Sequence, residues 1–367
     1  MKRLVTGLAA VLLLLALALS LVSCGDYKPV KSSASDLRAV ATVEGEEIRF
    51  ELVRAFLLSL SAEYGGGDPS VWQGEAGEAL FAEALSEAIE LSVEIYATFE
   101  ICEQNGIDPY GKKVNGIVSD RVATDIDGGI IDGNFIEGYG SKKKYLAALD
   151  ELGLTDSVNR LFHRWDACLA LLYEKMITNL DGGANIISPE DVRAFYDSED
   201  CARISWVFIS NANSGDPNQY YLKAQRARAA LLDCNTYAEM SLIVAQNTLN
   251  LSYDQIDNGF CLSTKGGIGS GDRRLCETAS ELGDLEISEI IETDLGLYIL
   301  IGLSKSASYF NSHEEYFDSH EEEIHDLALE HRLYESIDSE AERLLGGISY
   351  TELYSALTAA DFFGVEK

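Results

Sequence analysis

The segment Gly283-Asp-Leu-Glu-Ile-Ser-Glu-Ile-Ile-Glu-Thr-Asp-Leu-Gly-Leu-Tyr-Ile-Leu-Ile301 decides the fold of the central part of this chain. Its two runs rich in β-branched and aliphatic residues, Ile287 to Ile291 and Leu297 to Leu303, flank an acidic turn that contains a glycine. Runs of this kind on either side of a turn predict two adjacent strands that close a small sheet. Because helical patterns fill most of the remaining chain, we expect an α+β fold.

The same segment resembles the end of a parvulin (PpiC-type) peptidyl-prolyl isomerase domain. That family has a pattern such as L-x-x-G-E-I-S-x-V-V-x-T-x-x-G-Y-H-I-I, and Tyr298 stands here where the family has histidine. The helix start Ser188-Pro-Glu-Asp-Val, the apolar strand from Ile204 to Ile209 and the helices near Gln225 and Tyr237 resemble the preceding elements. The resemblance covers roughly 188–304. It implies a small antiparallel sheet with helices, in the order βααβ followed by the paired strands.

The two ends of the chain resemble PrsA and SurA-type foldases. Residues 39–50 predict a strand, a glycine turn and the start of a helix, as at the opening of those proteins. Apolar residues three and four apart predict long helices over 80–102, 158–176 and about 313–345. The resemblance implies that the last helix packs back on the N-terminal ones. We therefore expect a helical SurA/PrsA-like chaperone module built from both chain ends, with an inserted parvulin-like domain.

The N-terminus predicts export. Two basic residues precede an apolar run, 4–22, and the run ends in Leu-Val-Ser-Cys24. A charged start, a short apolar core and small residues before the break are typical of a secretory signal, and an N-terminal transmembrane helix is the alternative. The last four residues resemble the lipobox of bacterial lipoproteins. That resemblance implies a lipid anchor on Cys24 and an extracytoplasmic protein attached to the bacterial cell membrane.

These patterns together predict five segments of the chain. The expected segments are a lipoprotein signal peptide (1–23), a tether (24–37), an N-terminal helical chaperone segment (38–183), a parvulin-like domain (184–305) and a C-terminal helical segment (306–367) that packs on the N-terminal module.

The formal net charge of −33 is unusually acidic. Such a surface repels nucleic acid and anionic lipid headgroups, so nucleic-acid binding is not expected. The charge favours cationic or apolar client segments, and it also serves solubility alone; both interpretations stay open.

Neither a metal nor a cofactor is expected. His320 and His325 are five residues apart, whereas the H-E-x-x-H motif needs four, and the Gly- and Asp-rich stretch 125–138 lacks the EF-hand residues, so it is predicted to be a surface loop. No pair of cysteines has the C-x-x-C spacing, and both free thiols and disulfides stay open. The cysteines beyond the lipobox are Cys102, Cys168, Cys201, Cys234, Cys261 and Cys276.

The catalytic residues of the parvulin family are largely replaced. Its two facing histidines fall on Trp206 and Tyr298, and two pocket positions fall on Leu275 and Ser280. Cys261 is a candidate for the family's Cys or Asp position by residue type alone. None of the 5 histidines lies in the parvulin-like region. We therefore expect no standard catalytic residue. The residues expected to line a peptide-binding surface are Trp206, Phe208, Leu275 and Tyr298. The alternative is that Trp206 and Tyr298 merely fill the space of the lost histidines.

The resemblance implies a membrane-anchored extracytoplasmic chaperone or foldase that binds unfolded exported polypeptides, with a parvulin-like domain weak or inactive in prolyl isomerisation. An active isomerase with non-standard residues is the first alternative. A solute-binding lipoprotein is the second, and it predicts repeated βα units around a parallel sheet.

Overall fold

The structure, a computed structural model, describes residues 37–65, 69–131, 134–178, 187–210, 217–248, 251–264, 273–293, 296–309 and 316–363. The signal segment, the tether up to residue 36 and Cys24 lie outside these residues, so the expectations for them stay predictions. Within the described ranges, none of the helices has the length and apolar character needed to cross a membrane.

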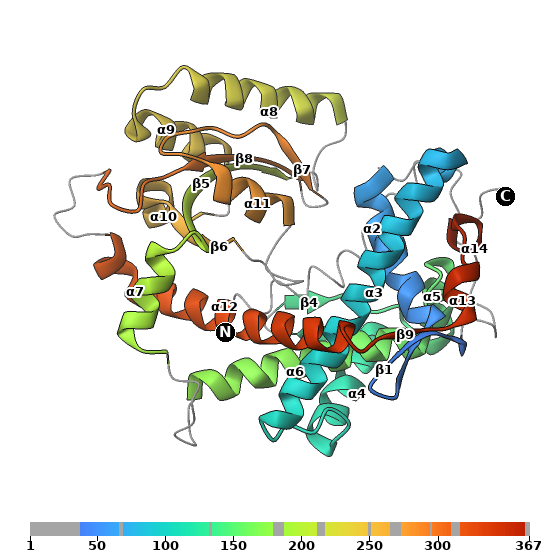
Figure 1. The fold of residues 1–367 in the computed structure, drawn as a ribbon. Helices are drawn as coiled ribbons and strands as arrows, with labels where there is room; N and C mark the ends of the chain where they lie inside the picture. The colour runs from blue at the N-terminus through green and yellow to red at the C-terminus, as the bar shows by residue number, and fades with distance from the viewer. Residues whose placement is uncertain are drawn as a thin grey trace. The chain divides into compact units, whose positions relative to one another are not determined.

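The chain divides into two compact units. The first combines residues 1–175 with 335–367, and the second spans residues 176–334. Both contain helices and small antiparallel sheets (Figure 1), which confirms the α+β class and the module built from both chain ends. The long helix α12 (Tyr316–Leu345) contributes its first part to the second unit and its last part to the first. The predicted segment boundaries stay predictions.

A three-stranded antiparallel sheet joins the two ends of the chain in the first unit. β1 (Ala39–Val43) pairs on one side with β2 (Glu46–Arg49) and on the other with β9 (Ser349–Tyr350). The expectation of a helix directly after the glycine turn is wrong. Glu44 and Gly45 both have positive φ and turn the chain back as a tight hairpin, so a second strand forms before the helix begins at Phe50.

Helices build the rest of the first unit. Two of them, α3 and α6, are the long helices predicted over 80–102 and 158–176. In α3 the apolar stripe is buried, as at Ala84, Ala88 and Ile95. Near the C-terminus, Phe362 packs on Phe50 with 4.7 Å between ring centroids. The elements are α2 (Phe50–Gly65), the 3-10 helix η2 (Pro69–Trp72), α3 (Gly74–Gln104), α4 (Lys112–Asp127), α5 (Lys142–Glu151), α6 (Asp156–Thr178), α13 (Glu352–Ala356) and α14 (Ala359–Phe363).

The stretch predicted as a surface loop is largely a helix end and a hairpin. Helix α4 continues to Asp127, and β3 (Gly129–Ile131) then pairs antiparallel with β4 (Asn134–Ile136). The hairpin closes because two glycines allow close approach of its ends: a Cβ on Gly138 would lie 2.0 Å from the nitrogen of Gly128. Among the described residues, no group of three His, Cys, Asp or Glu side chains is placed to hold a metal.

The second unit contains a four-stranded sheet in the order β6-β5-β8-β7, with every neighbouring pair antiparallel. Helices α8 and α9 cover one face and α11 covers the other (Figure 1). This topology argues against the solute-binding alternative, which needs a parallel sheet. The elements are α7 (Pro189–Asp197), β5 (Cys201–Ser210), α8 (Pro217–Leu232), α9 (Tyr237–Asn247), α10 (Tyr253–Asn258), β6 (Phe260–Ser263), α11 (Arg273–Glu281), β7 (Ile291–Thr293) and β8 (Gly296–Gly302).

The strand expected at 287–291 is shorter and begins later. It meets β8 first through a single bridge between Ile287 and Ile301, and the regular strand β7 starts only at Ile291. Between them, the N–H of Leu300 donates to the side-chain oxygen of Ser288 at 2.8 Å rather than to a backbone carbonyl. The side-chain oxygen of Ser288 thus replaces a backbone carbonyl in the hydrogen-bond ladder of the sheet and interrupts the strand.

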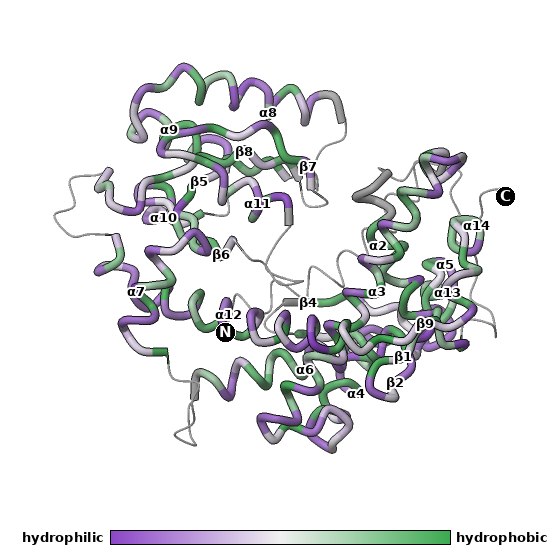
Figure 2. The backbone as a smooth tube through the Cα atoms, viewed as in Figure 1, coloured by the Kyte–Doolittle hydropathy of each residue, from purple (hydrophilic) through white to green (hydrophobic). Residues whose placement is uncertain are grey.

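Two apolar layers follow from the period-two alternation of the strands. Figure 2 shows β5 and β8 as largely hydrophobic, whereas α8 alternates between hydrophobic and hydrophilic residues. Val207 and Ile209 point toward α8 and α9, where Leu231 and Met240 are buried. The alternate residues of the same strand point to the other face, and this face carries the candidate site.

Candidate functional site

The face of the sheet covered by α11 is lined with aromatic residues. Ile204, Trp206 and Phe208 alternate along β5 and therefore share this face. The antiparallel register places Tyr298 of β8 opposite Phe208 and Phe260 of β6 opposite Ile204. Three strands thus contribute to one aromatic face.

The four rings are in direct contact. The centroid of Trp206 lies 4.6 Å from that of Phe260 and 5.2 Å from that of Tyr298, both edge to face. Phe208 lies 4.5 Å from Tyr298 in a tilted arrangement. Edge-to-face and offset contacts at these distances are the favourable geometries of aromatic pairs. We call this group of Trp206, Phe208, Phe260 and Tyr298 the aromatic cluster.

Helix α11 packs over part of the cluster. Its residues Leu275 and Ala279 are 6% and 3% exposed and belong to the same apolar layer. Ser280 is exposed and donates a hydrogen bond to the carbonyl of Glu277, so it lies outside this layer. Trp206 and Phe208 stay partly exposed. The structure therefore brings Trp206, Phe208, Leu275 and Tyr298 together, while their role in binding a peptide stays a prediction.

One polar atom of the cluster has no partner. The indole Nε1 of Trp206 is buried and makes no hydrogen bond within the part of the chain that the structure describes. A buried N–H without an acceptor costs about 1–3 kcal/mol. Because the atom has almost no accessible surface, a ligand carbonyl can accept from this N–H and remove that cost only after the side chains around it move.

Cys261 lies on the wrong face of the sheet for the Cys or Asp position of the family. It is paired with Arg203 across β5 and β6, one residue out of phase with Phe260 and Ile204. A hydrogen bond with the Cys201 thiol, together with burial, holds the pKa of the Cys261 thiol well above its ordinary range. Such a thiol is not a nucleophile. The candidate is wrong because residue type alone does not determine which side of a strand a residue occupies.

Two histidines of the second unit, His320 and His331, pack against other side chains. His331 is buried against the Phe195 ring at 5.0 Å and shares a hydrogen bond of 3.2 Å with Ser263. His320 stacks on Tyr316 at 3.9 Å and meets Asp254 at 2.8 Å. Neither belongs to the apolar layer of the aromatic cluster.

Arg203 is the residue that sequence reasoning missed. It is 3% exposed at the start of β5, and its guanidinium donates to the carbonyls of Asn258, Ser304 and Ala307 at 2.6–3.0 Å. The guanidinium carbon also lies 4.0 Å from the centroid of the Tyr316 ring. The available signal was an arginine in an otherwise apolar strand, because a buried charge is found only where hydrogen bonds satisfy it.

Comparison with known proteins adds the following. No family model and no curated protein matches the sequence. Among the solved structures that match is PrsA of Bacillus subtilis, with 11% sequence identity and a TM-score of 0.25; the match covers 85% of this chain and 93% of that one. Another is the foldase PrsA of Streptococcus pneumoniae, with 12% identity and a TM-score of 0.32; the match covers 75% of this chain and 89% of that one. A third belongs to the SurA-like chaperones of Campylobacter jejuni (14%, 86% and 99%, TM-score 0.23).

These matches are of the PrsA and SurA-like kind that the sequence motifs resemble. All three TM-scores are below 0.5.

Proposed function

We propose that this chain is a membrane-anchored extracytoplasmic chaperone that binds unfolded exported polypeptides on the aromatic cluster. The observation that supports this proposal is the set of four contacting rings beside the unpartnered Nε1 of Trp206. An extended apolar segment offers side chains that pack on the rings and carbonyl oxygens that accept from the indole. Transient binding of this kind lowers the concentration of free unfolded chain by mass action.

The proposal includes little or no turnover. Rotation about a peptide bond has a barrier of about 18–20 kcal/mol, and the parvulin family lowers the prolyl barrier with two histidines. Here Trp206 and Tyr298 occupy those positions, and a tryptophan offers a hydrogen-bond donor but cannot exchange a proton as histidine does. Binding without efficient isomerisation is the function that these residues support best.

Peptide binding should depend on Trp206. Replacing it by Ala is expected to weaken the binding of capped apolar peptides about tenfold or more, since aromatic anchors at the centre of a site dominate affinity. Trp206→Phe keeps most of the packing and removes only the N–H, so a loss of about three- to tenfold is expected if a carbonyl accepts from Nε1. Titrations followed by NMR, with the chain from Gly25 onward, measure both effects.

The matched control is Tyr253→Ala, which removes an aromatic side chain that is 90% exposed on α10. It should leave affinity unchanged, and an equal loss in both variants would contradict the proposal. The same samples test the enzymatic alternative through NMR exchange of Xaa-Pro peptides. Exchange clearly above the uncatalysed rate, reduced by Trp206→Ala and by Tyr298→Phe, would establish an active isomerase.

The lipid anchor is a separate part of the proposal. If Cys24 carries a lipid, the mature protein should have the mass of the chain from Cys24 onward plus that of the lipid, and Cys24→Ala should lack the mass of the lipid. One acyl chain binds membranes only marginally, so stable retention requires two. Cys234→Ala, which alters another cysteine, serves as the control. An unmodified chain that has the mass of the whole sequence, with residues 1–23 still attached and without a lipid, would instead favour a transmembrane helix at the N-terminus.

A further inference from the structure

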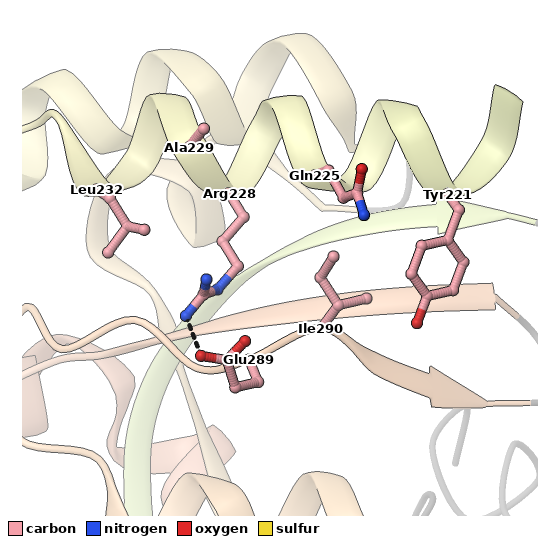
Figure 3. Close-up of a pocket in the computed structure, with 7 residues that line it drawn as sticks. All are labelled: Tyr221, Gln225, Arg228, Ala229, Leu232, Glu289 and Ile290. Carbon is pink, nitrogen blue, oxygen red and sulfur yellow. Dashed lines mark hydrogen bonds and ion pairs between the residues drawn. The ribbon is translucent and has the colours of Figure 1, made fainter. Parts of the chain in front are cut away.

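A groove lies on the face of the sheet opposite the aromatic cluster, along one flank of α8. It encloses a cavity of about 360 Å³ between this helix and the segment before β7, where Glu289 and Ile290 face the helix (Figure 3). The helical residues that line it are spaced four, three and four apart, which places them on one stripe. The residues of this stripe are Tyr221, Gln225, Arg228 and Leu232, and Ala229 of the same helix also lines the cavity.

The groove exposes apolar surface to solvent. Tyr221 is 39% exposed and Leu232 is 55% exposed, and Ile290 is only partly buried across from them. The buried residues of α8, such as Ala224 and Leu231, lie on a different side of the helix and pack in the apolar layer. The apolar side chains of the exposed stripe, Tyr221 and Leu232, are therefore not part of this apolar layer.

Arg228 is held in place and yet available to a ligand. Its Nε donates to the carbonyl of Ser288 at 2.8 Å, which fixes the guanidinium at the groove. Its Nη2 pairs with Glu289 (Figure 3), whose side chain is 83% exposed. A solvent-exposed ion pair contributes little stability. A carboxylate from a ligand can consequently replace Glu289 without loss of the Ser288 bond.

The charge of α8 contrasts with that of the whole chain. The net charge is −33, but the helix from Pro217 to Leu232 contains Lys223, Arg226 and Arg228 and no Asp or Glu. Within the cavity lining Glu289 balances Arg228, so an anionic group complements Arg228 where it replaces this exposed carboxylate.

The groove also borders an open sheet edge. β7 is the last strand in the order β6-β5-β8-β7 and pairs only with β8 among the described strands. The outer row of backbone groups on an edge strand is a template for one further strand. An extended peptide added there would run beside Ile290 and place alternate side chains toward α8.

We propose that this groove binds an extended polypeptide segment that adds to the edge of β7, with an apolar side chain between Tyr221 and Ile290 and a carboxylate on Arg228. The inference rests on the proposed function, because the occupant is a client polypeptide. It adds a second site, selective for segments with an acidic residue, on the face of the sheet opposite the aromatic cluster.

The test compares two capped nine-residue peptides in which valine alternates with serine and the central residue is either aspartate or lysine. Their affinities are measured by fluorescence anisotropy on the chain from Gly25 onward and on its variants. Arg228→Glu should weaken the aspartate peptide about tenfold or more and tighten the lysine peptide, since charge-assisted hydrogen bonds are the strong ones. Arg228→Gln should weaken the aspartate peptide alone.

Arg226→Glu is the matched control, because it makes the same charge change on an exposed position of the same helix outside the cavity lining. Equal changes of peptide affinity in Arg226→Glu and Arg228→Glu would overturn the proposed groove site, because they would show that long-range charge alone determines the affinity. Loss of binding in Trp206→Ala with no change in Arg228→Glu would overturn the groove and keep the proposed function. Loss only in Arg228→Glu would support the groove and contradict the aromatic cluster, and no binding to the unmodified chain would overturn both.

Discussion

Replacing Arg203 by Met is expected to destabilise the second unit by about 3 kcal/mol or more. The side chain is almost fully buried and donates to three backbone carbonyls, those of Asn258, Ser304 and Ala307. Methionine fills a similar volume but donates nothing, so these carbonyls would lose their charged partner. Each buried group left without a partner costs about 1–3 kcal/mol.

The effect should extend beyond the immediate contacts. Arg203 joins the start of β5 to the end of α10 and to the segment after β8, and its guanidinium lies over Tyr316 of α12. Trp206 is three residues further along the same strand. Loss of Arg203 should therefore loosen the strand that supports the aromatic cluster, and peptide affinity should fall together with stability.

Native-state hydrogen exchange, followed peptide by peptide, separates the two units and measures this change in β5. Arg193→Met is the matched control: Arg193 is a partly exposed residue of α7 that pairs with Asp197 at 2.9 Å and lies 4.8 Å from the centroid of the Phe317 ring, and its loss should cost less than about 2 kcal/mol. Arg203→Lys retains the charge but not the planar fork of donors, so most of the loss should remain. Equal protection in the Arg203→Met and Arg193→Met proteins would show that the buried guanidinium does not stabilise the sheet.

Most of the helices could be predicted from sequence, because their signals are local. The apolar stripes of α3, α6 and α12 are long and regular. The pair Ser188 and Pro189 predicts the start of α7, where Ser188 and Asp191 form a capping box. The strand pair β7 and β8 was recognised for the same reason, since β-branched residues and the glycine lie close together in the chain.

The predictions from sequence are wrong where contacts between residues far apart in the chain determine the local structure. The Ser288 side chain takes a ladder hydrogen bond from Leu300, which no local pattern around residue 288 reveals. The hairpin at 129–136 depends on two glycines that approach each other from either side of it. The positions of Trp206 and Tyr298 were predictable from the parvulin resemblance, but their direct ring contact needs the register of two strands 90 residues apart.

Removing the charge of Glu94 is expected to stabilise the first unit at neutral and alkaline pH. Burial is the main cause that raises the pKa of this carboxyl from 4.5 to about 8, and the carboxylates of Asp338, Glu90 and Glu87 act in the same direction. Asp338 belongs to α12 and the other residues to α3, so the negative charges meet where the C-terminal helix contributes to the first unit. The folded state therefore favours the protonated carboxyl.

The sign of the pH dependence follows from the two pKa values. Below about pH 4.5 the carboxyl is protonated in both states and costs no stability. Between pH 4.5 and 8 the unfolded chain releases the proton more readily than the folded chain, so the free energy of unfolding falls as the pH rises. Above about pH 8 the charge is present in both states and the full penalty applies.

Glu94→Gln should abolish this fall. Because the side chain is partly exposed and solvent screens part of the repulsion, we expect a gain of about 1–3 kcal/mol at pH 8 and almost none at pH 4.5. Urea unfolding of both proteins across this range, with hydrogen exchange in α3 to isolate the first unit, measures the difference. Glu90→Gln removes an exposed carboxylate one turn earlier and should gain less than about 0.5 kcal/mol. Parallel pH profiles for Glu94→Gln and the unmodified chain would mean that Glu94 is ionised in the folded state without penalty.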